Sequence, residues 1–250
     1  MPTHTASHQK IKPPRPESDA RNVVTLWAAG AAAGILLFLG VLCARWGFAD
    51  LIVTDAMARQ AFLQAEAARI GVPVTSKEAD EVIASLLRAQ YIDPNNPATA
   101  EQLGGAYTID VQDTRQQGSN RAVTREWAKA YEQYSRAVAL RPTSPYAWAN
   151  RAWTKYYQGK VDMELYVAMQ NAINLGPWEP EVQFVVVDLG FALWDEMPID
   201  LRPQILTLAQ NGQRRYATQI VAIAQKRGRL TEVCKLEKLA SLPACASHRG

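Results

Sequence analysis

The sequence predicts an all-α fold in which a solenoid of helical hairpins follows one N-terminal transmembrane helix and ends in a helical cap. Three observations support this fold. A charge-free apolar run covers residues 23–44, and helical patterns without strand alternation fill most of the chain after it. Prolines that can end helices recur five residues behind alanines, at Ala89 and Pro94, Ala137 and Pro142, and Ala172 and Pro177. The last of these intervals is close to the roughly 34-residue period of a helix–turn–helix repeat.

The N-terminal tail and the apolar run are predicted as separate elements. Residues 1–22 are polar and proline-rich, which predicts a disordered cytoplasmic tail. At about 1.5 Å per residue, the helix over 23–44 can cross a hydrocarbon core of roughly 30 Å. A cleaved signal peptide is the alternative, although its apolar core is usually only about 7 to 15 residues long. Gly30 and Gly34 have the spacing of a helix-dimerising face, so they mark a candidate homodimer contact.

Basic residues predict the orientation of the apolar helix. The tail before it is more basic than the segment directly after it, and basic flanks prefer the cytoplasm. The main domain is therefore expected on the far side, which in a double-membraned bacterium is the periplasmic side of the inner membrane. The basic residues before the run are Lys10, Lys12, Arg15 and Arg21, and those after it are Arg45 and Arg59.

The next elements are predicted from helix stop and start signals. Residues 45–74 are expected to form a juxtamembrane helix and a linker, with the helix ended at Gly71–Pro73. Thr75 and Glu78 have the spacing of a capping box, which opens a helix running to about Gln90. This helix is expected to supply the second half of a first, incomplete repeat.

Residues 75–197 fit the pattern of tetratricopeptide repeats. The stretch Leu103–Tyr107 (LGGAY) matches the first helix of the pattern, and Ala130–Pro142 (AYEQYSRAVALRP) matches the second. Trp148 then falls on the tryptophan position of the next repeat and is expected to pack between helices. Lys155 departs from the pattern, because a tyrosine is usual there. An ordinary antiparallel helical bundle is the alternative, since it places alanines and aromatics at similar spacings.

Two segments are predicted outside the regular repeat. The polar stretch Gln112–Asn120 is expected to loop out between the helices of the first full repeat. Residues 198–250 are expected to form a C-terminal cap and tail, since solenoids need a polar end for solubility. Its helices are expected at about 202–210, 213–226 and 230–242.

Composition and motifs argue against catalysis and nucleic-acid binding. The formal net charge of +3 is small and dispersed, and the basic cluster Lys226–Arg229 is interpreted as a solvated helix end. His4, His8 and His248 all lie in the tails, so the folded part is expected to hold neither a metal site nor a histidine-based catalytic group. The sequence also has no glycine-rich phosphate loop. We therefore expect a protein that is not an enzyme and uses no cofactor.

A partner-binding groove is predicted on the first helices of the hairpins, which line the concave face of a tetratricopeptide stack. It comprises Tyr146, Asn150, Trp153 and Tyr157 on one helix and Asp188 on the next. Such a groove is aromatic and mildly acidic, and it suits peptides or sugars. The alternative is that Trp153 and a neighbouring tyrosine only pack helices together.

The stretch Ala137–Met197 resembles a narrower family. Its segments RAVALRPTSPYAWANRAW, AMQNAINLGPWEPEVQ and LGFALWDEM are similar to the single-span tetratricopeptide proteins of proteobacterial exopolysaccharide clusters, the VpsP-like proteins. The resemblance implies an inner-membrane accessory protein that contacts protein components of a polysaccharide synthesis or export complex, and it assigns no catalytic residue. The competing hypothesis is a periplasmic chaperone or assembly factor for cytochrome maturation or cell-envelope biogenesis.

The cysteines predict one disulfide. Cys43 lies within the apolar run, which leaves Cys234 and Cys245 on the side expected to be oxidising. Pro243 between them can turn the chain back, and a bridge closing so short a loop would contribute about 2 to 3 kcal/mol. Two unpaired thiols, or a bridge between chains, are the alternatives.

Overall fold

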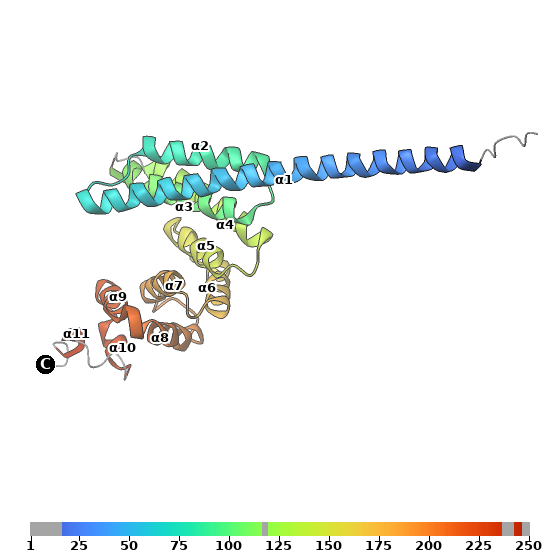
Figure 1. Ribbon diagram of the computed structural model, residues 1–250. Helices are drawn as coiled ribbons and strands as arrows, with labels where there is room; N and C mark the ends of the chain where they lie inside the picture. Colours follow the sequence, from blue (N-terminus) through green and yellow to red (C-terminus); the bar gives the residue numbers. More distant parts are fainter. Residues whose placement is uncertain (1–16, 117–119, 237–242, 247–250) are drawn as a thin grey trace, which may run out of the picture. The chain divides into compact units, whose positions relative to one another are not determined.

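The protein is described from a computed structural model for residues 17–116, 120–236 and 243–246. Within these ranges all regular secondary structure is helical (Figure 1), which confirms the predicted all-α class. The chain forms two compact units, Met1–Gly47 and Phe48–Gly250, and each is considered by itself. The helices are α1 (Glu17–Ile70), α2 (Ser76–Ile92), α3 (Pro97–Gln116), α4 (Asn120–Leu140), α5 (Pro145–Tyr157), α6 (Met163–Leu175), α7 (Pro180–Ala192), α8 (Leu201–Asn211), α9 (Gln213–Lys226), α10 (Leu230–Cys234) and α11 (Pro243–Ala246).

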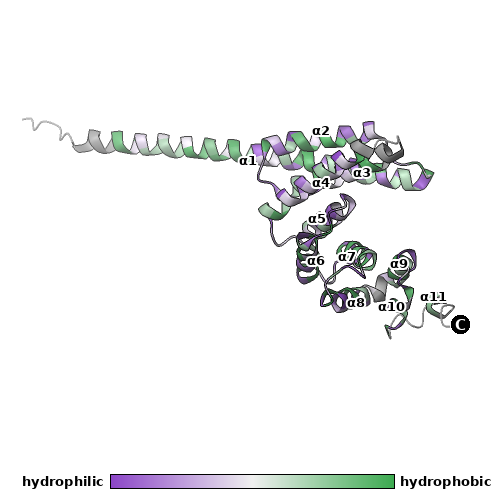
Figure 2. Ribbon diagram, turned by 180° about the vertical axis from the view of Figure 1, so that it is seen from behind, coloured by the Kyte–Doolittle hydropathy of each residue, from purple (hydrophilic) through white to green (hydrophobic). Residues whose placement is uncertain are grey.

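The first unit contains the apolar part of α1. Figure 2 shows this part mostly in hydrophobic and neutral colours, and almost all of its side chains from Val23 to Gly47 are exposed. The segment Val23–Ile70 of α1 is the one candidate for a membrane span, by length and composition, within the described part of the chain. The predicted disorder of 1–22 is wrong for 17–22, which are helical, and 1–16 lie outside the described residues.

In the second unit, the rest of α1 lies beside α2, α3 and α4 (Figure 1), and the four helices share one hydrophobic core. The juxtamembrane segment is therefore part of a folded bundle, because it buries Val53 and Ala56 in that core. The predicted capping box of α2 is confirmed: the Glu78 backbone N–H donates to Thr75 Oγ1, and the Thr75 backbone N–H donates to the Glu78 carboxylate. The core residues are Val53, Ala56, Val82, Ile83, Leu86, Ala89, Leu103, Ala106, Tyr107, Ala130 and Tyr134.

A second core joins helices α5 to α10. It includes residues of α5, α6 and α7, which were expected to hold repeats, and residues of α8, α9 and α10, which were expected to form the cap. The two predicted segments therefore share one hydrophobic core. A small cluster of Ala100, Ala137, Val138 and Ala147 links α3, α4 and α5, and Trp148 packs against it. Trp148 therefore lies between helices, as its position in the pattern predicted.

Two predicted boundaries are wrong. The expected loop Gln112–Asn120 is helical over residues 112–116, because these five residues include no glycine or proline and contain the good helix formers glutamine and arginine. Residues 117–119 lie outside the described residues. The expected helix 230–242 ends at Cys234. A helix continuing over 11 residues would separate its ends by roughly 16 Å, whereas the Cα atoms of Cys234 and Cys245 are 5.4 Å apart.

Candidate functional site

The predicted groove residues of α5 share one side of that helix. The hydroxyl of Ser144 caps α5 by accepting a hydrogen bond from the backbone N–H of Ala147 at 3.3 Å, and Pro145 fits the first helical position. The small residues Ala147, Ala149 and Ala152 are buried against neighbouring helices. The predicted set Tyr146, Asn150, Trp153 and Tyr157 follows helical spacing and is partly exposed along the whole helix.

Aromatic rings meet at the C-terminal end of α5. Trp153 packs edge-on against Trp127 of α4, with ring centroids 5.1 Å apart, and Tyr157 stacks on Trp127 at 4.8 Å. Tyr156 contacts Tyr157 edge-on at 5.2 Å. We call Trp127, Trp153, Tyr156 and Tyr157 the aromatic cluster. Trp153 and Tyr157 therefore pack helices together while keeping part of their surface exposed, which agrees with the packing alternative.

Trp127 was not predicted as part of this site. It is 4% exposed, and its indole N–H has no hydrogen-bond partner within the described residues. The sequence holds one signal for it, because Trp127 precedes Ala130, the first position of the matched second-helix pattern, by one helical turn. Tryptophan at that spacing faces the same side as the packing alanine.

At the N-terminal end of α5, the hydroxyl of Tyr146 already has a hydrogen-bond partner within the fold. Its hydroxyl donates a hydrogen bond to the carboxylate of Glu179, which directly precedes α7. This hydrogen bond and partial burial raise the pKa of Tyr146 to about 12. The hydroxyl therefore remains protonated at neutral pH. The side chain of Asn150 is half-buried on the same side of α5.

Asp188 forms an ion pair within the fold. Arg227, just after α9, donates to both of its carboxylate oxygens, at 2.8 and 2.5 Å, and both side chains are less than a fifth exposed. The hydrogen bond to Asp188 and the negative charge of its carboxylate raise the pKa of Arg227 above its usual range. The acidic character predicted for this position is therefore neutralised.

The basic cluster Lys226–Arg229 consequently has a structural role. The prediction of a solvated helix end is wrong for Arg227, and Arg229 also donates to the carboxylate of Asp195. Both arginines connect the C-terminal helices to α7 and the turn after it. A repeat pattern could not indicate this, because the partners are more than 30 residues apart in the chain.

A buried lysine joins α4, α5 and α6. Lys155 is 5% exposed, and its ammonium donates to the carboxylates of Glu164 and Asp162, the latter at 3.0 Å. Glu164 also accepts hydrogen bonds from Tyr131, at 2.7 Å, and from Arg151. We call these five residues the Lys155 network. This network explains why a lysine can stand where the repeat pattern has a tyrosine. The buried ammonium of Lys155 finds hydrogen-bond partners within the fold.

The Lys155 network stabilises the fold around neutral pH. Burial alone would lower the pKa of Lys155, but hydrogen bonds to Glu164 and Asp162 outweigh it and raise the pKa. Hydrogen bonds from Lys155 and Tyr131 lower the pKa of Glu164. The contribution of the Glu164 carboxylate to the free energy of unfolding is fully present above the pKa that this group has in the unfolded chain. It is lost as the pH falls through the lower pKa of Glu164 in the folded protein. The lysine contribution is lost as pH rises through its raised pKa.

The two predicted cysteines come together. Cys234 at the end of α10 and Cys245 in α11 form a disulfide, and Cys43 in α1 is a free, exposed thiol. Within the described part of the chain, no group of three or more histidine, cysteine, aspartate or glutamate side chains could hold a metal ion. The histidines at positions 4, 8 and 248 lie outside that part.

No protein-family model matches the chain, and no curated protein matches it.

Proposed function

We propose that the protein is a membrane-anchored tetratricopeptide scaffold that assists exopolysaccharide polymerisation or export by binding other proteins of the complex. The observation that carries this proposal is the packing order of the helices. α5 contacts its hairpin partner α6 and also α7, the first helix of the next hairpin, and α7 in turn contacts α8 and α9. Stacked hairpins that touch through successive first helices are the architecture of a helical solenoid, and solenoids serve as extended binding surfaces.

The surface of α5 supports a role in protein binding. The aromatic cluster keeps part of its rings accessible, and aromatic residues are the usual anchors of protein interfaces. Trp178 in the turn between α6 and α7 is 71% exposed. Its turn is held in place, because Gln183 and Asn211 donate side-chain hydrogen bonds to the Pro177 carbonyl at 2.9 and 3.3 Å. A rigid turn that presents a tryptophan loses little conformational freedom when a partner binds.

The charged groups around α5 support scaffolding more than acid–base chemistry. Asp188 is paired with Arg227, and Glu164 is bonded to Lys155 and Arg151. These carboxylates therefore hold helices together. A general acid or base needs a group free to meet a substrate at hydrogen-bond distance, and these groups are already engaged.

The cellular setting is inferred from the sequence. The basic N-terminal flank favours a cytoplasmic N-terminus and a periplasmic main domain on the bacterial inner membrane. The resemblance over Ala137–Met197 supplies the link to exopolysaccharide, and the spacing of Gly30 and Gly34 supports a homodimer within the membrane.

Deletion of the gene tests the function. We expect the deletion strain to secrete less or shorter polymer while lipid-linked repeat units are still made, because a scaffold acts after their synthesis. The full chain should restore the polymer, and a chain lacking residues 1–44 should not. Normal polymer amount and length in the deletion strain would remove the proposal. Normal polymer combined with loss of a cytochrome or another envelope product would favour the chaperone hypothesis instead.

A further inference from the structure

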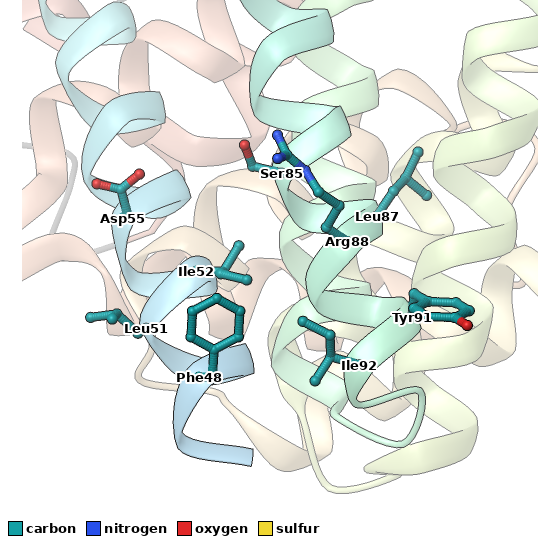
Figure 3. Close-up of a pocket in the computed structure, with 9 residues that line it drawn as sticks. All are labelled: Phe48, Leu51, Ile52, Asp55, Ser85, Leu87, Arg88, Tyr91 and Ile92. Atoms are coloured by element: carbon teal, nitrogen blue, oxygen red, sulfur yellow. The ribbon is translucent and has the colours of Figure 1, made fainter. Parts of the chain in front are cut away.

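A groove of about 890 Å³ opens between α1 and α2 at the beginning of the second unit (Figure 3). Its volume lies in the range of roughly 300 to 1,000 Å³ that is common for small-molecule sites. Two helical stripes line it. The α1 side is formed by Phe48, Ile52 and Asp55, and the α2 side by Ser85, Arg88 and Ile92. Spacings of three and four residues place each stripe on one face of its helix.

The two ends of the groove differ in polarity. Phe48, Ile52 and Ile92 lie together at one end, whereas Asp55 and Arg88 lie at the other (Figure 3). α1 enters the groove at Phe48, so the apolar end is the one nearest in sequence to the apolar run of α1. The groove is therefore amphipathic along its length. Its apolar end is nearest in sequence to the apolar run, and its polar end is farther from it.

The apolar end is exposed although it is rich in large hydrophobic side chains. Phe48 is 58% exposed, and Leu51 beside it is 65% exposed. Leu87 and Tyr91 border the groove on α2 and are also exposed. Apolar patches rimmed by charged residues mark binding surfaces, so this end is expected to be covered by an apolar group.

The groove lies close to the membrane if residues 23–44 span it. Phe48 follows Ala44 by four residues, and four residues can extend at most about 14 Å. The apolar end of the groove is therefore within that distance of the end of the span, whatever the arrangement of the two units. A bilayer lipid is the apolar molecule present at this place.

The polar end has two charges without internal partners. Within the described part of the chain, neither Asp55 nor Arg88 forms an ion pair, and Arg88 uses only its Nε, which donates to the Ala84 carbonyl at 3.3 Å. The terminal nitrogens of a guanidinium suit a phosphate group, and a carboxylate suits an ammonium group. One cation and one anion at the same end of the groove complement a zwitterionic headgroup.

We propose that the groove between α1 and α2 binds one phosphatidylethanolamine molecule of the membrane that holds α1. The acyl chain lies against Phe48, Ile52 and Ile92, the phosphate lies at Arg88, and the ammonium lies at Asp55. In this arrangement the acyl chain lies at the end of the groove that is nearest in sequence to residues 23–44, and the headgroup lies at the other end. The proposal rests on the membrane anchor and not on the role in polysaccharide export.

The test uses the full chain in nanodiscs that contain phosphatidylethanolamine with a photoreactive group on its acyl chain. Illumination followed by peptide mapping should label the α1 and α2 residues of the apolar end as well as residues 23–44. Ile92→Asp should reduce the groove label about tenfold, because it places a charge against the acyl chain. Val72→Asp is the control: Val72 is 53% exposed outside the groove, and its substitution should leave the label unchanged. Thermal unfolding by circular dichroism shows that both variants are folded.

The headgroup assignment is tested with photoreactive phosphatidylglycerol, which has a phosphate but no ammonium. Arg88→Gln should reduce the groove label from both lipids, and Asp55→Asn should reduce only the label from phosphatidylethanolamine. Lys77→Gln, at an exposed position of α2, is the control and should change neither.

Three outcomes would overturn the proposal. The groove label could be equal in Ile92→Asp and in the unchanged protein, or it could be confined to residues 23–44 as for any surrounding lipid. Crosslinks between two copies of the chain in place of lipid would assign the groove to a protein contact. Label on 23–44 shows independently that the anchor is inserted, so failure of the groove is distinguished from failure of the anchor.

Discussion

Replacing Gly104 by alanine tests the close packing of α3 against α4. Gly104 is buried, and a Cβ atom added to it would lie 2.8 Å from three ring carbons of Tyr134. Tyr134 is 4% exposed, so its ring cannot move into solvent without opening the core. The two helices must separate or the ring must leave its rotamer.

The expected cost follows from two opposing effects. Forcing a methyl group into a packed core costs about 1 to 3 kcal/mol, whereas alanine is a better helix former than glycine by about 0.5 to 1 kcal/mol. Gly105 separates these effects, because the nearest atom to its added Cβ is Gln60 Nε2 at 3.4 Å, an ordinary contact with a flexible side chain. Gly105→Ala should therefore gain the stabilisation from the higher helix propensity of alanine without the packing cost. The free energies of unfolding of the two variants should differ by about 1 to 3 kcal/mol.

The assay is urea unfolding of the full chain in detergent, followed by tryptophan fluorescence and far-ultraviolet circular dichroism. Gly104→Ala should have the lower midpoint and Gly105→Ala a midpoint equal to or above that of the unchanged protein. Equal midpoints for both variants, or a more stable Gly104→Ala, would show that α3 and α4 do not pack as closely as described.

Three other predictions concern the Lys155 network, the turn before α7 and the disulfide. Glu164→Gln should lower the free energy of unfolding by about 1 to 2 kcal/mol at pH 7, since it leaves a buried ammonium with fewer partners, and the difference from the unchanged protein should vanish on acidification. Lys155→Met should cost under about 1 kcal/mol, because the carboxylates that it leaves are half-exposed and regain water; a larger loss than for Glu164→Gln would contradict the burial pattern. Trp178→Ala should change stability by no more than about 0.5 kcal/mol yet reduce recovery of crosslinked partners from native membranes, and full recovery would exclude this tryptophan as an anchor. Cys234→Ser should lower the free energy of unfolding by about 2 to 3 kcal/mol, and a reducing agent should have the same effect on the unchanged protein but none on the variant.

The sequence predicted those features that depend on local chemistry. The capping box at Thr75 involves residues one turn apart, so its pattern is complete within a few letters. The helix ends before Pro94, Pro142 and Pro177 follow from the missing N–H of proline. The apolar run is likewise visible from composition alone.

Features that depend on distant partners were not predictable in the same way. The stretch Gln112–Gln116 is polar, which is typical of loops, but nothing in it breaks a helix, and α3 continues through it. The short α10 depends on where Cys245 lies, and a helical pattern over 230–242 contains no information about that bridge. Local propensity gives way to tertiary constraints at such places.

The helical period predicted which side of α5 the groove residues share, but it could not predict their partners. The period correctly placed Tyr146, Asn150, Trp153 and Tyr157 on one side of α5, because side direction depends only on spacing. It could not indicate which of these side chains a neighbour already occupies. Asp188 is neutralised by Arg227, and the Tyr146 hydroxyl is hydrogen-bonded to Glu179, so two of the polar groups expected to meet a ligand hold helices together instead. In the scaffold that we propose, the partly exposed aromatic rings on this side of α5 are the surfaces that would contact a partner, and specificity would come from their shape more than from charge, because Asp188 is already paired.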